Sequence, residues 1–388
     1  MSIYLPYIVL IGLLLTGSLL EVIGVRKEQM RWVRWFIVAF LLLFVGLRYN
    51  TGADWKMYTY VFDSIPIGMK KLGWEIGFVG LMKTFYYLFG NYYVLQFAAT
   101  LFLLFAVNRL YSRYSSYPVL SISLFVFLFL FTILMAQVRQ SIALGIVLLA
   151  TPYIFDKKFL PFVVTVGIAS LFHVSAVLAL PLYFLNRPIN KYVAVVFVVL
   201  AQCIYAYPEI IFNTMDLMSP IMPTRFEKLI SVYRETVFAK KVVFGTGVYY
   251  MASVALCIIT LLWYKREDNQ HHFYSNALLA TFVLVGLSNT VSILERFQPY
   301  YYAYAIVAFV GLLDGRIKPI AQKSIQSVCF CLVFAFFLLR IAVALTNTQV
   351  ASLTGRPINY GYVPYYNLVS YPPEADERLD WFQKESKK

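Results

Sequence analysis

Long apolar runs alternate with short polar connections along most of this chain. The runs cover approximately residues 3–24, 31–47, 92–109, 119–135, 137–155, 159–173, 174–186, 190–207, 243–264, 273–293, 297–313 and 324–346. They follow neither the alternation of a half-buried strand nor the apolar stripe of a surface helix. About 20 apolar residues in a helix cross the roughly 30 Å of hydrocarbon in a bilayer. The pattern predicts an all-α, polytopic transmembrane bundle of about 12 helices.

Basic residues gather in the connections between these runs. The clusters are Arg26/Lys27/Arg31/Arg34, Arg109/Arg113, Lys157/Lys158, Arg187/Lys191, Lys265/Arg266 and Arg316/Lys318/Lys323. Short loops rich in Lys and Arg usually face the cytoplasm. These clusters share one side only if residues 159–186 form two short helices in a hairpin, because one long helix would turn every later cluster outward. We therefore favour the hairpin.

The composition agrees with a membrane protein. Hydrophobic residues make up 61% of the 388 positions and charged residues 13%, and the mean hydropathy is +0.70. Soluble domains carry about 25% charged residues. The net charge of +14 is spread over separate loops, so it indicates orientation in a membrane and disfavours nucleic-acid binding.

Three segments outside the runs are long enough to be functional, and the expected topology places all three on the extracytoplasmic side. They are residues 48–91, 208–242 and the Tyr- and Pro-rich tail 347–388. Residues 74–89 within the first segment are typical of an interfacial or re-entrant helix. Residues 1–346 are then a transmembrane domain, and 347–388 an extracytoplasmic tail.

Polar residues at the edges of apolar runs are costly in lipid, which makes them candidates for function. Arg48 ends the second run and is followed within a few residues by Asn50, Asp54, Trp55 and Tyr58. Arg48 alone fits a snorkelling side chain beside an aromatic belt. Together the residues fit an arginine fork for a phosphate, with Asp54 as its partner or as a base.

Two further candidates interrupt apolar runs. Arg139 and Gln140 open a predicted helix, where free N–H groups and the helix dipole favour an anion. His173 lies inside the expected hairpin, either as a buried structural side chain or as a proton acceptor near neutral pH.

The last candidates lie near the end of the chain. Glu295 and Arg296 form either a structural ion pair with another helix or part of a site, and Tyr300 follows them. Aromatic side chains, including Tyr365 and Tyr366 in the tail, suit stacking on the apolar faces of sugars.

Several common catalytic motifs are absent from the sequence. It contains no Walker A loop, no dinucleotide-binding glycine motif, no zinc-protease motif and no Gly-x-Ser-x-Gly elbow. It also lacks the paired acids of a metal-dependent nucleotide-sugar transferase, so we expect no metal and no cofactor. A lipid-linked diphosphate fits these observations, because it carries its own leaving group and needs cations to bind it.

The ordered set of motifs resembles the EpsG group of Wzy-type bacterial polysaccharide polymerases. The motifs are Gly46-Leu-Arg48-x-Asn50-x-Gly52-x-Asp54-Trp55-x-x-Tyr58, Arg139-Gln140-Ser141-Ile-Ala143, Phe172-His173-x-Ser175-Ala176, Glu295-Arg296-Phe297 and the tail Tyr362 to Tyr366. The resemblance implies a GT-C-like helical enzyme of the bacterial inner membrane that joins undecaprenyl-diphosphate-linked repeat units of a lipopolysaccharide or exopolysaccharide at the outer face. Its expected partners are these lipid-linked substrates and the bilayer, and possible ones are a flippase and a chain-length regulator.

Roles follow from the resemblance and from the chemistry that the reaction requires. Cations that stabilise the leaving diphosphate would be Arg48, Arg139 and Arg296, with Gln140 beside them. The base for the attacking hydroxyl would be His173, Asp54 or Glu295, with His173 favoured. Glycan contacts would come from Asn50, Trp55, Tyr58, Tyr300, Tyr365 and Tyr366. Two alternatives stay open: an O-antigen-type ligase, and a transporter or flippase of lipid-linked oligosaccharide.

Overall fold

The computed structural model describes residues 4–67, 73–206, 244–264, 266–288 and 292–313, together with positions 335, 338, 342, 345, 362 and 365–369. The chain divides into two compact units. Unit 1 comprises Met1–Val177 and Phe337–Lys388, and unit 2 comprises Leu178–Phe336. The predicted outer loop 208–242, almost all of the apolar run 324–346 and most of the tail lie outside the described residues.

Unit 1 is built from helices. They are α1 (Leu5–Val22), α2 (Lys27–Gly46), α3 (Trp55–Asp63), the 3₁₀ turn η2 (Ile65–Ile67), α4 (Ile76–Phe89), α5 (Tyr92–Tyr114), α6 (Pro118–Phe129), the π-helical turn η3 (Leu130–Leu134), α7 (Val138–Leu149), α8 (Thr151–Phe155), α9 (Phe159–Ser170) and the start of the 3₁₀ helix η4 (Val174–Phe184). Within the described residues the only β pairing is one isolated bridge, between Arg48 and Asn367. The predicted all-α class is confirmed.

In the described part of the chain, four helical stretches are long and apolar enough to cross a membrane: Leu5–Val22, Lys27–Gly46, Tyr92–Tyr114 and Val138–Phe155. Shorter apolar helices accompany them, so the polytopic bundle predicted from the apolar runs is confirmed. The run at 159–186 is two short helices, because α9 ends at Ser170 and η4 begins at Val174. The reversal of direction that a hairpin requires stays a prediction.

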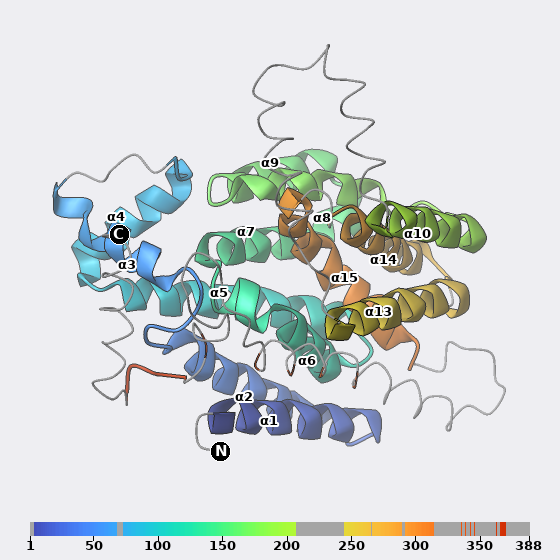
Figure 1. Ribbon diagram of the computed structural model, residues 1–388, viewed down its shortest axis with the longest axis horizontal. Coiled ribbons are helices and arrows are strands. Elements are labelled where there is room, and N and C mark those ends of the chain that lie inside the picture. Colours follow the sequence, from blue (N-terminus) through green and yellow to red (C-terminus); the bar gives the residue numbers. More distant parts are fainter. Residues whose placement is uncertain are drawn as a thin grey trace, which may run out of the picture. The chain divides into compact units, whose positions relative to one another are not determined.

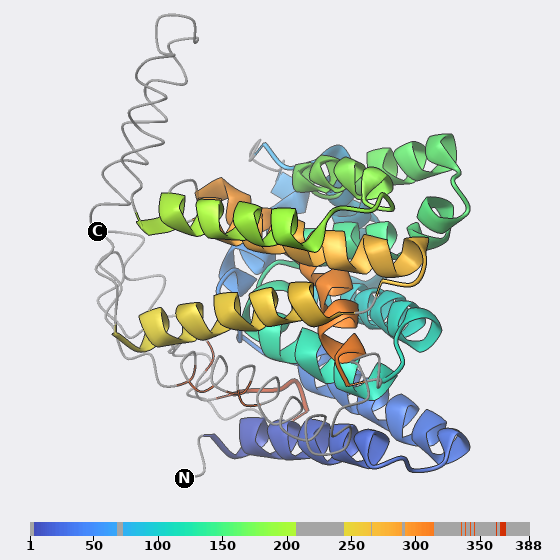
Figure 2. The same cartoon turned by 90° about the vertical axis from the view of Figure 1, so that its right-hand side faces the viewer.

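Helix α5 lies at the centre of unit 1, where α2, α4, α6 and α7 pack against it (Figure 1). Helices α1 and α2 lie side by side in both views (Figure 2). A buried hydrogen bond of 2.9 Å from Ser18 Oγ to Ser123 Oγ joins α1 to α6. The Glu21 carboxylate accepts hydrogen bonds from the N–H groups of Val119 and Leu120, so it caps the first turn of α6.

Unit 2 contains α10 (Lys191–Ala206), α13 (Phe244–Trp263), α14 (Asn269–Ser288), the 3₁₀ helix η6 (Ser292–Arg296) and α15 (Gln298–Gly311). Helix α14 packs against α10, α13 and α15. Figure 2 shows α10, α13 and α14 running side by side. Almost every residue of α15 is buried, including Tyr300, so this helix is the core of the unit.

Candidate functional site: a carboxylate shared by an imidazole and a guanidinium

Several helix ends of unit 1 meet at one place. The carbonyls of Gly46 and Arg48, at the C-terminal end of α2, accept hydrogen bonds from Gln96 Nε2 near the start of α5, at 3.1 and 2.9 Å. Glu75, which precedes α4, contacts Arg139 at the start of α7 and His173 after the end of α9. The side chains of Glu75 and His173, 98 residues apart in sequence, therefore meet at one end of this unit.

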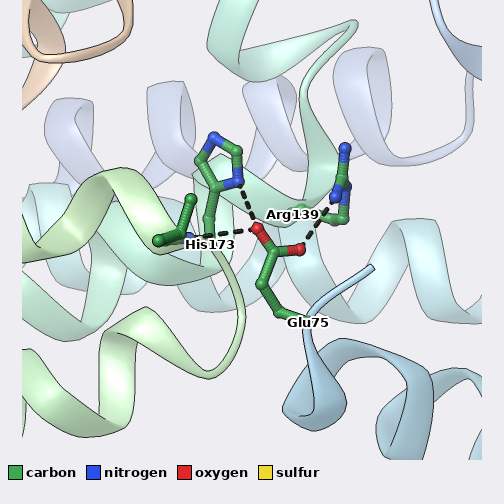
Figure 3. Close-up of polar contacts among 4 residues, drawn as sticks. Glu75, Arg139 and His173 are labelled. Carbon is green, nitrogen blue, oxygen red and sulfur yellow. Dashed lines mark hydrogen bonds and ion pairs between the residues drawn. The ribbon is translucent and has the colours of Figure 1, made fainter. Parts of the chain in front are cut away.

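Glu75, Arg139 and His173 form one cluster, which we call the Glu75 cluster (Figure 3). Arg139 Nη1 donates to Glu75 Oε2 at 2.8 Å. Glu75 Oε1 lies 3.0 Å from His173 Nδ1 and accepts the N–H of Val174 at 3.1 Å. The side chains are mostly buried, with exposed fractions of 14% for Glu75, 19% for Arg139 and 8% for His173. The carboxylate lies between the imidazole and the guanidinium.

Backbone hydrogen bonds hold this arrangement from both sides. The N–H groups of Gly77 and Phe78, in the first turn of α4, donate to the carbonyl of Leu171 at 2.9 and 3.3 Å. The Glu75 side chain in turn accepts the N–H of Val174 at the start of η4. Each segment therefore satisfies orphan donors of the other, which fixes Glu75 against the turn that carries His173.

Arg139 is held by aromatic side chains as well as by the carboxylate. Its guanidinium lies 4.8 Å from the centre of the Trp74 ring, the geometry of a cation–π contact. It also interacts electrostatically with the Tyr58 hydroxyl. A π-helical turn and a tight turn at residues 135–137 precede α7 and place Arg139 in its first turn.

The carboxylate of Glu75 is stabilised in its charged form. Burial alone would raise its pKa, but the N–H of Val174, the Arg139 cation and His173 outweigh burial and hold the pKa of Glu75 below its ordinary value. The charged cluster is therefore an ionised carboxylate with donors on both oxygens.

The predicted phosphate-binding loop forms a buried turn at residues 48–54. Arg48 is 1% exposed, and its guanidinium donates to the carbonyls of Val45 at 2.7 Å and Thr51 at 3.2 Å. Asn50 has a positive φ of 46° and its Oδ1 accepts the Tyr93 hydroxyl at 2.7 Å. Gly52 has a φ of 125°, and a Cβ there would lie 2.1 Å from the Met135 carbonyl oxygen. The turn packs against the segment that leads into Arg139.

Part of the tail completes this turn. The N–H of Tyr49 donates to the carbonyl of Tyr366 at 2.9 Å, and that of Leu368 donates to the carbonyl of Leu47 at 2.7 Å. The Tyr365 ring stacks on Phe44 at 4.5 Å, and its hydroxyl donates to the Phe44 carbonyl. Residues predicted as glycan contacts in the tail thus lie beside Arg48.

The charged side chains of Asp54 and Arg48 lie close enough to the same three tyrosines to interact with them electrostatically. Both charges interact electrostatically with Tyr58, Tyr92 and Tyr362. Tyr58 also interacts with Arg139 and packs on Trp74, with ring centres 5.4 Å apart. The predicted residues Arg48, Asp54, Tyr58, Arg139 and His173 are therefore linked by contacts within unit 1. Glu295 and Arg296, which the expected topology placed at the same boundary, belong to unit 2.

The comparisons with known proteins identify the family. The EpsG family model matches residues 31–367, which is most of the chain and includes Arg48, Glu75, Arg139 and His173. The chain belongs to the EpsG family. EpsG-like proteins are Wzy-type polysaccharide polymerases, so membership indicates a membrane-embedded, glycosyltransferase-like polymerase of polysaccharide biosynthesis. No curated protein and no solved structure matches the chain, so the GT-C-like likeness stays a prediction.

The remaining predicted residues of this EpsG-family chain are buried, apart from Glu295 and Arg296. Gln140, Trp55 and Asn50 are at most 3% exposed. Glu295 and Arg296 are exposed in η6 of unit 2, whereas Tyr300 is fully buried in α15. The assigned roles of all these residues stay predictions.

Sequence reasoning missed Glu75. The residue lies inside the segment 74–89 that was interpreted as an interfacial or re-entrant helix, and no role was assigned to it. One signal was present, because Glu75 is the only acidic residue between Asp63 and Asp156. A lone carboxylate at the edge of an apolar helix needs a cationic or hydrogen-bonding partner, and Arg139 and His173 are polar residues that interrupt nearby apolar runs.

Among the residues that the structure describes, no three His, Cys, Asp or Glu side chains lie close enough to hold a metal ion. The only titratable partners of Glu75 that its contacts show are Arg139 and His173. The arrangement suits proton transfer and anion binding.

Proposed function

We propose that this EpsG-family protein is a Wzy-type polymerase that joins undecaprenyl-diphosphate-linked oligosaccharide repeat units at the extracytoplasmic face of the bacterial inner membrane. The observation that carries the proposal is the Glu75 cluster, in which a proton acceptor and a cation are held about one carboxylate. Transfer from a lipid diphosphate requires these two groups: one to accept the proton of the attacking hydroxyl, the other to stabilise the leaving group.

The proposed step balances as follows. The acceptor sugar hydroxyl attacks the anomeric carbon of the donor glycan and forms a new C–O bond. The bond from that carbon to the phosphate oxygen breaks, and its electron pair leaves with the undecaprenyl diphosphate. The hydroxyl proton passes to His173. Arg139 offsets the charge that develops on the diphosphate, with no metal ion required for that purpose.

The other predicted residues have supporting roles in this proposal. Arg48 adds positive charge near the site, and Gln140 and Arg296 are further diphosphate contacts. Asp54 and Glu295 are the alternative bases, which single variants would distinguish from His173. The aromatic residues Trp55, Tyr58, Tyr300, Tyr365 and Tyr366, with Asn50, are the proposed glycan contacts.

The extracytoplasmic location of the site is supported by the loop charges. Lys157 and Lys158 lie at the end of unit 1 opposite to Arg139 along α7 and α8, as the positive-inside bias expects. A single-cysteine variant at position 54, probed with a membrane-impermeant thiol reagent, would be labelled from outside the cell. Labelling from the cytoplasm alone would contradict this orientation.

The deciding experiment uses purified protein in liposomes with its lipid-linked repeat unit. A ladder of lengthened glycans, formed in the presence of a chelator and without nucleotide, is the expected result. Translocation of the substrate without lengthening would contradict polymerisation, and transfer to a lipid A-type acceptor alone would indicate a ligase.

Arg139→Ala tests the assignment of the leaving-group cation. Loss of a preorganised donor to a developing oxyanion reduces turnover by about 10²–10³-fold, so we expect at least that loss with normal membrane insertion. Arg113→Ala is the matched control, because Arg113 is an exposed arginine near the far end of α5. Equal ladders from both variants would refute the assignment.

A further inference from the structure

The two oxygens of the Glu75 carboxylate have different partners. Oε2 accepts from Arg139 at 2.8 Å, whereas Oε1 contacts His173 Nδ1 at 3.0 Å and accepts the Val174 N–H at 3.1 Å. Figure 3 shows the carboxylate between the two side chains. Rotation of the carboxylate would break all three contacts together. The imidazole and the guanidinium are therefore oriented by a single group.

The contact with Glu75 selects the tautomer of His173. An ionised carboxylate has only acceptor sites, and the pKa of Glu75 lies below its ordinary value in this environment. The close nitrogen, Nδ1, must then carry the hydrogen that it donates to Oε1. In the neutral imidazole the lone pair is consequently on Nε2, the nitrogen that can accept a proton.

Arg139 keeps binding capacity while it contacts Glu75. The ion pair with Glu75 uses a single Nη1 donor out of the five that a guanidinium offers, and a further side-chain hydrogen bond joins Arg139 to Tyr58. Its Nε is buried and makes no hydrogen bond within the described residues. The Trp74 ring, 4.8 Å away, supports one face of the guanidinium. An anion can therefore bind Arg139 beside Glu75 or in place of it.

We propose that Glu75 is a positioning residue that orients His173 and Arg139 together for glycosyl transfer. This inference rests on the proposed function. When the donor diphosphate binds Arg139, the Glu75 charge is directed mainly toward His173. His173 Nε2 accepts the hydroxyl proton, and the imidazolium that results stays paired with the carboxylate, while the electron pair of the broken C–O bond leaves on the diphosphate. Binding of the donor diphosphate to Arg139 thus favours removal of the proton from the acceptor sugar hydroxyl by His173.

A purely structural ion pair is the alternative that must be separated from this role. Breaking a buried ion pair by removal of one partner strongly destabilises a protein, so loss of activity alone does not distinguish the two. The test therefore needs a measurement that follows the charge of Glu75 and not only its packing.

The test compares Glu75→Gln and Glu75→Asp with the wild type in the liposome assay. Glutamine keeps the shape and removes the charge, whereas aspartate keeps the charge and shortens the side chain. Asp63→Asn is the matched control, because Asp63 is an exposed carboxylate at the end of α3 in the same outer segment. Membrane insertion and monodispersity in detergent show which variants are folded.

We expect Glu75→Gln to lower kcat by about 10²–10⁴-fold, the usual contribution of general base catalysis. Its KM for the donor should stay within about threefold of the wild type or fall, because Arg139 loses a competing anion. Asp63→Asn should match the wild type in both parameters. A rise in donor KM with unchanged kcat would overturn the inference, since it would place Glu75 in substrate binding alone.

The pH profile is the decisive measurement. Arg139 from α7 and the Val174 N–H contact the carboxylate that faces the imidazole, and Tyr58 from α3 interacts with Arg139. A carboxylate beside His173 favours the imidazolium form. Removal of that carboxylate in Glu75→Gln should therefore move the acidic limb of kcat/KM to lower pH by about one unit. In Glu75→Asp the acidic limb should stay at the wild-type pH, while kcat is lower.

The outcomes separate this inference from the proposed function. If the wild type forms no ladder, the proposed function fails. If the wild type forms ladders, and folded Glu75→Gln either keeps the wild-type kcat or loses activity with an unmoved acidic limb, the polymerase assignment stands and the role of Glu75 is refuted.

Discussion

Gly77 controls how closely α4 approaches the turn that carries His173. Its N–H donates to the Leu171 carbonyl at 2.9 Å. A Cβ at this position would lie 2.7 Å from the Leu171 oxygen and 2.9 Å from the Leu171 Cβ. Real Cβ atoms essentially never approach other atoms so closely, so Gly77→Ala forces the first turn of α4 away from residues 171–173.

The size of this displacement can be worked out from the structure. Ordinary contact begins at 3.4 Å, so the Leu171 oxygen and the new Cβ must separate by about 0.7 Å. If α4 moves as one piece, the distance between Glu75 Oε1 and His173 Nδ1 grows from 3.0 Å to about 3.7 Å, which is beyond hydrogen-bond range. A misplacement of about 1 Å can cost roughly 100-fold in rate.

Gly80 provides a matched control on the same helix. A Cβ at Gly80 meets no atom within 4 Å. Alanine is favoured over glycine inside a helix by about 0.8–1.0 kcal/mol, so Gly80→Ala should be neutral or stabilising and fully active. Gly77→Ala gains the same helix propensity but incurs an overpacking cost of about 1–3 kcal/mol.

The assay measures glycan ladder kinetics and thermal unfolding of both variants in one detergent. We expect Gly77→Ala to lose about 10–100-fold in kcat while its unfolding temperature changes little, because the propensity gain offsets part of the clash. If the two alanine variants have equal turnover, the close approach of α4 does not control the Glu75–His173 contact, and the geometric reasoning is wrong.

Two further predictions concern the turn and the carboxylate. Gly52→Ala should destabilise the protein by at least about 1–3 kcal/mol, because Gly52 has a φ of 125° and the Met135 oxygen occupies the position of a Cβ. The control is Gly24→Ala, since Gly24 also has a positive φ but has open space around it. Equal melting temperatures of the two variants would contradict this prediction. Glu75 has a depressed pKa, so its contribution to stability is complete above its ordinary value of 4.5 and is lost as the pH falls through the lower value of the folded state. The difference in melting temperature between wild type and Glu75→Gln should therefore disappear once the buffer is more acidic than the folded-state pKa of Glu75. A difference that persists there would refute the ionised pair.

Much of the fold could be predicted because lipid imposes a simple rule on sequence. Apolar runs up to residue 313 coincide with helices or consecutive helices within a few residues, since backbone groups in hydrocarbon must be satisfied internally. The break between α9 and η4 was predicted from charge, not from local propensity. Arg139 and His173 were found for the same reason, because polar groups interrupt apolar runs at a cost.

The contacts that build the site were not predictable from local pattern. Glu75 lies in a connecting segment, where a carboxylate is unremarkable until Arg139 and His173 are placed beside it. The bridge between Arg48 and Asn367 joins positions more than 300 residues apart, and no periodicity encodes such a pairing. Sequence pattern reports on each helix separately, whereas the site depends on which helix ends meet.

The two arginines near the site show what the structure adds to a list of charged residues. Sequence reasoning treated Arg48 and Arg139 alike, as cations at the edge of the membrane. Arg48 is 1% exposed and donates to the backbone carbonyls of Val45 and Thr51, whereas the Arg139 side chain is 19% exposed and pairs with the Glu75 carboxylate. A leaving group must reach the cation that stabilises it. We therefore infer that Arg139 contacts the diphosphate directly, and that Arg48 acts through the turn that it holds and through the field of its charge.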